Sequence, residues 1–138
     1  MNAKDYLMQV KRLDYLIKNK QDEIEKLKAM TLNGENYGGE RVSTSPNPQS
    51  QENLYIKIIE FKNRLESDVI KSIELKKEII SVIDKVTNAD YVYILHERYL
   101  NFKTWEEIAV EMNYTYRWIT ELHGRALIEV EKILNTSY

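Results

Sequence analysis

The chain of 138 residues has no cysteine, few glycines and prolines, and no long apolar run. The absence of cysteine excludes a disulfide framework and a thiolate metal site, and it suits a reducing compartment. No segment is apolar enough to span a membrane, and charges at Asp5, Lys11 and Arg12 interrupt the start of the chain, where a signal peptide would be apolar. We therefore expect a cytoplasmic protein that makes no membrane contact.

The residues that most often interrupt helices are concentrated in one window. Three of the four glycines and both prolines fall between Gly34 and Pro48. Everything outside this window is compatible with helix. The window itself is poor in large apolar side chains, so burial cannot offset the entropy lost on ordering it. The composition predicts an all-α fold with a flexible linker at about residues 32–50.

Apolar residues recur at helical spacing on both sides of this linker. From about Ala3 to Thr31 the stripe has Lys20 as its one polar position and otherwise contains Tyr6, Val10, Leu13, Ile17, Ile24 and Leu27. From about Gln51 to Val86 the stripe has several steps of four, which depart from a strict heptad, and contains Leu54, Ile58, Phe61, Leu65, Val69, Ile73, Ile80 and Ile83.

Two such helices are unstable alone, because exposed apolar surface costs about 25 cal/mol per Å². We expect residues 1–87 to form a long antiparallel, coiled-coil-like helical hairpin, and a second copy to share its seam in a homodimer. A short helix then follows. Thr87 with Asp90 has the pattern of a capping box, Tyr91, Leu95 and Tyr99 are its expected core face, and Asn101 is its expected end.

The stretch from Thr104 to Leu127 has the pattern of a helix-turn-helix. Thr104 and Glu107 are spaced as a capping box, so a helix is expected to begin at Trp105. Ala109 is small enough to let a second helix cross close to its backbone. Asn113 occupies the turn, where a left-handed residue is needed and asparagine is tolerated.

The second helix of this motif is expected to begin after Thr115, a capping residue. At about 100° per residue, its apolar side holds Ile119, Leu122, Ala126, Val130 and Ile133. The opposite side holds Arg117, Thr120, Glu121 and Gly124. We expect that side to face the major groove of DNA, with Arg117 on a guanine edge or a phosphate and Glu121 on a cytosine amino group.

The candidate DNA-binding residues are Thr115, Tyr116, Arg117, Trp118, Thr120, Glu121, Gly124 and Arg125. Other readings stay open at this point, since most polar helix faces are simply solvated. Trp118 fits core packing as well as a phosphate contact through its indole N–H. Glycine is unfavourable inside a helix, so Gly124 indicates close approach of a DNA backbone or of another helix, unless the residue has no function. His123 borders the apolar side, which favours a buried or capping imidazole.

The region from Asp90 to Leu134 resembles the promoter-reading region four of bacterial sigma factors. The residues that carry the likeness are Leu95, Arg98-Tyr99-Leu100, Thr104-Trp105-Glu106-Glu107-Ile108-Ala109 and Arg125-Ala126-Leu127. With Leu122-His123-Gly124 and the N-terminal half, the chain is similar to small phage and prophage regulators of the ArpU and RinA kind. The resemblance implies transcriptional control in a bacterial host, with residues 88–138 as the DNA-binding domain. Tyr116, Trp118 and Glu121 depart from the sigma pattern, so no promoter sequence is implied.

Charge bears on the expected partners. Residues 88–138 carry five basic and eight acidic side chains, a net charge of −3, whereas phosphate contacts usually require a basic face. Tight binding to double-stranded DNA therefore requires a second copy of this chain, or bacterial RNA polymerase, to add affinity. The alternatives are a DNA-packaging protein of the small-terminase kind and a module that docks on RNA polymerase without touching DNA.

No pattern of enzyme chemistry occurs in the sequence. Glu106 and Glu107 lie in the first turn of their helix, where interaction with the helix dipole explains them better than catalysis. There is no glycine-rich phosphate loop, nucleophile elbow or metal-ligand spacing. We expect no catalytic residue, no cofactor and no metal site.

Overall fold

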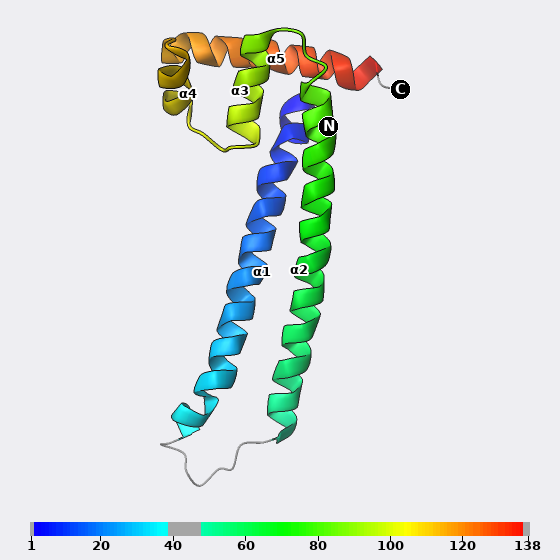
Figure 1. Ribbon diagram of the computed structural model, residues 1–138, viewed down its shortest axis with the longest axis vertical. Coiled ribbons are helices and arrows are strands. Elements are labelled where there is room, and N and C mark those ends of the chain that lie inside the picture. Colours follow the sequence, from blue (N-terminus) through cyan, green and yellow to red (C-terminus); the bar gives the residue numbers. More distant parts are fainter. Residues whose placement is uncertain (1, 39–47, 137–138) are drawn as a thin grey trace. The chain divides into compact units, whose positions relative to one another are not determined.

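The structure is a computed structural model that describes residues 2–38 and 48–136, with side chains for 2–31 and 49–136. The described residues form five helices: α1 (Ala3–Gly38), α2 (Pro48–Ile83), α3 (Ala89–Tyr99), α4 (Trp105–Met112) and α5 (Tyr116–Thr136) (Figure 1). The described residues include no strand, and the predicted all-α class is confirmed. Within those residues, none of the helices has the length and apolar character to cross a membrane.

Both long helices extend into the segment that was expected to be a linker. α1 continues through residues 32–38, beyond the predicted end at Thr31, and α2 already begins at Pro48. No proline interrupts residues 32–38, so the backbone there is compatible with helix. Proline is well suited to the first turn of a helix, because its missing N–H has no partner to lose there. The rest of the expected linker, residues 39–47, lies outside the described residues.

The chain divides into two compact units, Met1–Leu13 with Ser72–Tyr138 and Asp14–Lys71, called here unit one and unit two. These are not the segments 1–87 and 88–138 expected from the helix pattern, because the first turns of α1 and the last turns of α2 contribute to the core of unit one. In unit two the α1 and α2 segments run antiparallel (Figure 1). There Ile24, Leu27 and Ile58 are buried.

The stripe predicted for α1, including Lys20, is buried or half-buried throughout and is confirmed. The stripe predicted for α2 is wrong in part, since Val69, Ile73 and Ile80 are exposed. The side chains that are covered instead alternate in steps of four and three: Leu54, Ile58, Phe61, Leu65, Asp68, Ser72, Leu75, Ile79 and Val82. The predicted stripe contained only apolar residues, whereas the observed seam includes the polar residues Asp68 and Ser72. The prediction therefore followed the wrong side of α2 from Val69 to Ile80.

The polar seam position at Asp68 is explained by its partner on α1. The Lys20 ammonium donates to the Asp68 carboxylate, and the two side chains are only 31% and 13% exposed. A half-covered carboxylate needs such a partner, because removing a charge from water without compensation is costly. The ion pair therefore keeps the heptad spacing of α2 in register with α1.

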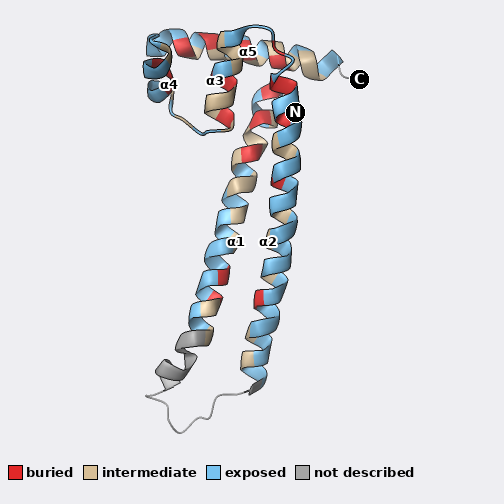
Figure 2. Cartoon of the chain, viewed as in Figure 1, coloured by how far each residue is buried: buried red, intermediate tan, exposed pale blue. Residues whose placement is uncertain are grey.

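The core of unit one brings together the start of α1, the end of α2, and helices α3 and α5. Its buried residues are Ala3, Leu7, Val10, Ile79, Val82, Ile83, Val86, Leu95, Tyr99, Ala126 and Val130. Figure 2 colours buried positions of the chain red. A backbone contact accompanies this packing, since the Ala3 N–H donates to Glu131 Oε2 at 3.1 Å. The last turns of α5 are thus packed into the same core as the first turns of α1.

The cap of α3 differs from the predicted one. Asn88, not Thr87, is the N-cap, and its Oδ1 accepts from the N–H groups of Asp90 at 2.9 Å and Tyr91 at 3.2 Å. Asparagine is as good a cap as threonine, so the helix begins one residue later than the pattern suggested. Leu95 and Tyr99 are buried as predicted, and Ile94, which the sequence reading missed, is fully buried.

The Lys20–Asp68 pair generates a stability prediction. Lys20→Met leaves the covered Asp68 carboxylate without a cation, and we expect the free energy of unfolding to fall by about 1–2 kcal/mol. Urea denaturation followed by circular dichroism measures the change, with Lys18→Met on the exposed side of α1 as the control. In the double variant Lys20→Met, Asp68→Leu the loss should disappear, because an apolar pair removes the desolvation cost. A double variant as unstable as the single one would contradict this account.

Candidate nucleic-acid interface

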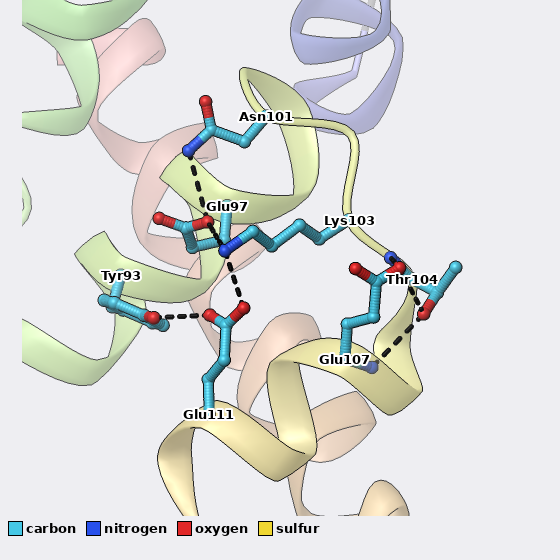
Figure 3. A network of polar contacts seen from close by, with 7 residues as sticks. All are labelled: Tyr93, Glu97, Asn101, Lys103, Thr104, Glu107 and Glu111. Atoms are coloured by element: carbon cyan, nitrogen blue, oxygen red, sulfur yellow. Dashed lines mark hydrogen bonds and ion pairs between the residues drawn. The ribbon is translucent and has the colours of Figure 1, made fainter.

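The site is built on the unit α4–turn–α5, and its first element is the start of α4. Thr104 Oγ1 accepts from the Glu107 N–H at 3.2 Å, and Glu107 Oε1 accepts from the Thr104 N–H at 3.3 Å (Figure 3). Two otherwise unpaired N–H groups are thereby satisfied at the helix start. The predicted capping box is confirmed, and α4 begins at Trp105 as expected.

The turn after α4 has the backbone conformation that the sequence predicts. Asn113 adopts φ 58° and ψ 40°, in the left-handed region. The Tyr114 N–H donates to the Ala109 carbonyl at 3.0 Å, which closes the end of α4. Thr115 Oγ1 then accepts from the Trp118 N–H at 3.1 Å and caps α5. The direction of α5 relative to α4 is therefore set within three residues, Asn113–Thr115.

A small apolar cluster fixes α5 against α4 and α3. Its buried members are Ile94, Ile108, Ala109, Ile119 and Leu122, and Trp105 and Met112 pack against it. Ile119 is fully buried, and the small side chain of Ala109 allows the two helices to approach closely. The predicted apolar side of α5 is confirmed, with Ile119, Leu122, Ala126 and Val130 buried and Ile133 half-buried.

His123 is the polar member of the same packing. Its Nε2 lies 2.6 Å from the Tyr99 hydroxyl, and its ring centroid lies 4.4 Å from that of Trp105. Burial disfavours the imidazolium, and the charges of Lys4 and Arg98 oppose it further, so the pKa of His123 is lowered to about 4. The imidazole is therefore neutral at pH 7 and holds α5 to α3 and α4, in agreement with the predicted buried histidine.

A polar network ties the loop between α3 and α4 to both helices (Figure 3). Lys103 Nζ contacts Glu97 at 2.8 Å and Glu111 at 2.6 Å, and the Tyr93 hydroxyl donates to Glu111 at 2.5 Å. The hydrogen bonds to Lys103 lower the pKa of Glu97 and Glu111 and raise that of Lys103. The same loop contains Phe102, whose φ of 57° is unfavourable for a bulky side chain.

Sequence reasoning did not find this network. Glu97, Lys103 and Glu111 carry no motif spacing, and only the packing of α4 on α3 brings their side chains together. The network positions α4, the first helix of α4–turn–α5, and does not contribute to the exposed face of α5. Within the described residues, no group of three or more histidine, cysteine or acidic side chains is arranged to hold a metal ion.

Most of the predicted contact residues lie on the exposed face of α5. Thr120 is half-buried, and exposed side chains or backbone are found at Thr115, Tyr116, Arg117, Trp118, Glu121, Gly124 and Arg125. Thr115 is engaged as the helix cap, and Thr120 Oγ1 donates to the Arg117 carbonyl at 2.9 Å. The guanidinium of Arg117 makes no ion pair among the described residues, so it is free to bind an external group.

Arg125 connects two other predicted residues. Its Nη2 donates to Glu121 Oε1 at 3.2 Å, and its guanidinium carbon lies 5.2 Å from the ring centroid of Trp118. Trp118 is 37% exposed and belongs to neither buried cluster, which argues against its core reading. The three side chains form a surface cluster next to Arg117 along the helix.

Gly124 has no packing explanation inside the described part of the chain. A Cβ atom built at this position meets nothing within 4 Å. Close approach of another helix of the same chain is therefore not the reason for this glycine. Approach of an external molecule, or no function, are the readings that remain.

Comparison with known proteins gives one description. A family model described as "Protein of unknown function (DUF1492)" matches residues 36–127, which is more than half of the 138 residues. The match includes α3, α4 and the first turns of α5. No curated protein matches the chain, and no solved structure matches it.

The environment of His123 predicts how stability depends on pH. Between the ordinary pKa of 6.5 and the folded value of about 4, the unfolded chain binds a proton that the folded chain does not. The contribution of His123 to stability is therefore complete above pH 6.5 and is lost as the pH falls toward 4. We expect the urea midpoint to drop between pH 7 and pH 5, and to drop less in His123→Phe. Equal pH dependence in the two proteins would show that His123 is not the responsible group.

Proposed function

The chain belongs to the DUF1492 family, whose description assigns no activity, and we propose that it is a phage- or prophage-type transcriptional regulator that binds promoter DNA through α4–turn–α5. In this proposal the unit is a sigma-region-four-like helix-turn-helix, and α1 with α2 forms a helical hairpin that carries it. The protein acts on double-stranded DNA together with bacterial RNA polymerase.

One observation carries the proposal: a short left-handed turn and a buried Ile119 orient α5, whose first turns remain uncovered. In a helix-turn-helix the second helix enters the major groove, and residues near its N-terminus contact base edges. Arg117 and Glu121 occupy such positions, on the side of α5 opposite Ile119. A rigid helix with exposed polar groups at its start is what this mode of binding requires.

The chemistry of the exposed side chains fits a duplex. Arg117 has no competing ion pair among the described residues and presents a planar donor group to guanine or to a phosphate. Arg125 is held by Glu121, but an exposed pair at this spacing contributes only about 0.3–0.5 kcal/mol. DNA can therefore separate the two, with Arg125 moving to a phosphate and Glu121 accepting from a cytosine amino group. The indole N–H of Trp118 is a further phosphate donor.

Charge limits the affinity of one such unit. Residues 88–138 carry −3, and Glu106 and Glu107 are exposed on α4. Phosphate neutralisation supplies most non-specific binding to DNA, so a single acidic unit binds weakly. The exposed Glu106 and Glu107 support a second candidate function, in which α4 docks on a basic surface of RNA polymerase and α5 touches no DNA.

The two candidates are separated by variants of the exposed face. DNA fragments from the neighbourhood of the protein's own gene are screened for binding at low salt, with and without RNA polymerase. Arg117→Ala should weaken binding by about 1–3 kcal/mol at one site position if it contacts a base, and should weaken all sequences alike if it contacts a phosphate. Lys132→Ala, near the other end of α5, is the matched control.

The double variant Arg117→Ala, Thr120→Ala extends this test. Both residues lie away from the buried side of α5, so circular dichroism and the melting temperature should be unchanged. Unaltered DNA binding and promoter output in the folded double variant would exclude the proposed face and favour docking on RNA polymerase.

Gly124 provides an independent prediction. Since a Cβ meets nothing there, Gly124→Ala should stabilise the free protein by about 1 kcal/mol through helix propensity. If a DNA backbone approaches the helix at this point, the same change should weaken DNA binding. Thermal denaturation and a binding titration on one preparation measure both effects. A more stable protein with undiminished affinity would assign Gly124 no part in binding.

A further inference from the structure

In unit two, several large apolar side chains of α2 are exposed to solvent. Tyr55, Ile56, Ile59, Val69 and Ile70 are between 37% and 57% exposed. Scattered apolar residues are normal on protein surfaces, but these form two groups on one side of α2, separated by Lys62 and Glu66, which indicates a contact surface. These residues do not belong to the seam with α1, which contains Leu54, Ile58, Phe61, Leu65 and Asp68.

Three of these residues, with two charged residues between them, have the spacing of a second seam. Tyr55, Ile59, Lys62, Glu66 and Val69 follow one another in steps of four, three, four and three, each one residue after a seam position. This is the spacing at which one helix packs continuously against another. Among the described residues of unit two, α1 covers the first seam and no helix covers the second. We call the five residues the outer stripe.

The outer stripe is complementary to itself when reversed. Ile59 and Val69 lie five residues on either side of position 64, and Lys62 and Glu66 lie two residues on either side of it. An antiparallel copy centred there places Ile59 opposite Val69 of the copy and Lys62 opposite Glu66 of the copy. A twofold axis makes each of these contacts occur twice. A parallel copy would instead place Lys62 opposite Lys62.

We propose that a second copy of this chain docks on the outer stripe of α2, antiparallel to it, and forms a homodimer. The opposite charges at the centre and the apolar side chains on both sides identify this occupant, because the same surface serves both partners. Antiparallel seams pair the two kinds of seam position with each other, as this register does.

A groove beside the stripe adds room for the partner's side chains. It has a volume of about 310 Å³ and is lined by Lys28, Thr31, Tyr55, Ile58, Ile59 and Lys62. In the antiparallel register, Val69 and Ile70 of the second copy lie at this end of the stripe. The covered length from Tyr55 to Ile70 is about 22 Å at 1.5 Å per residue.

Dimerisation through α2 does not depend on DNA binding, and its test uses no DNA. If both inferences hold, each complex carries two α4–turn–α5 units, and their joint binding compensates for the weak affinity of one acidic unit. Failure of the dimer would leave the Arg117 prediction intact, and failure at Arg117 would leave the dimer intact.

The test is a charge-exchange series on the full-length chain, read by sedimentation equilibrium. The wild type should be a dimer. Lys62→Glu places two acidic residues in each central pair, and Glu66→Lys places two basic ones, so each should raise the dissociation constant by about tenfold or more. The double variant Lys62→Glu, Glu66→Lys should recover the dimer. An equimolar mixture of the two single variants should form a heterodimer, because their central charges are complementary.

Lys57→Glu is the matched control, since it makes the same charge change on the side of α2 away from the outer stripe, and it should dimerise as the wild type does. Circular dichroism establishes that each variant is folded. A monomeric wild type, a ring of many subunits, or single variants that dimerise as tightly as the wild type would each overturn the proposal. A single-variant effect that the double variant and the mixture do not reverse would also overturn the antiparallel register.

Discussion

The close packing of α5 on α4 is the constraint on which the candidate interface depends. Ile119 is fully buried beneath α4, and Ala109 leaves the space for it. Once Ile119 points inward, helix geometry turns Arg117, Glu121 and Gly124 outward. The left-handed turn at Asn113 makes this arrangement possible within three residues. A change in that packing would move the whole exposed face, so stability and the proposed function share the same contacts.

Polar groups inside the packing give both units their specific register. In unit one, His123 lies against Tyr99 and Trp105 and is kept neutral by burial. In unit two, Asp68 occupies a seam position because Lys20 reaches it. Apolar side chains tolerate sliding and rotation, whereas a hydrogen bond or an ion pair in a covered site is satisfied in one geometry only. These polar contacts therefore select one arrangement among several that apolar burial alone would permit.

The acidic character of the C-terminal region and the uncovered apolar surface of α2 fit together. In the proposed function, residues 88–138 carry a net charge of −3 and gain little from phosphate neutralisation alone. A second copy that docks on the outer stripe would double the number of such units without adding charge contacts to either. If both proposals hold, the long helices contribute binding energy indirectly, by bringing two copies of α4–turn–α5 onto one duplex.

Local features of this protein could be predicted from the sequence, and features that depend on distant partners could not. The all-α class, the capping box at Thr104, the left-handed Asn113 and the apolar side of α5 depend on residues a few positions apart, so helix geometry and turn chemistry determine them. The polar seam position at Asp68 and the Lys103 network depend on side chains that only tertiary packing brings together. For that reason the sequence misplaced Val69, Ile73 and Ile80 in the seam of α2. The sequence likewise predicted Trp118 and Arg125 as individual contact residues. Only the tertiary structure brings them together with Glu121 in one surface cluster.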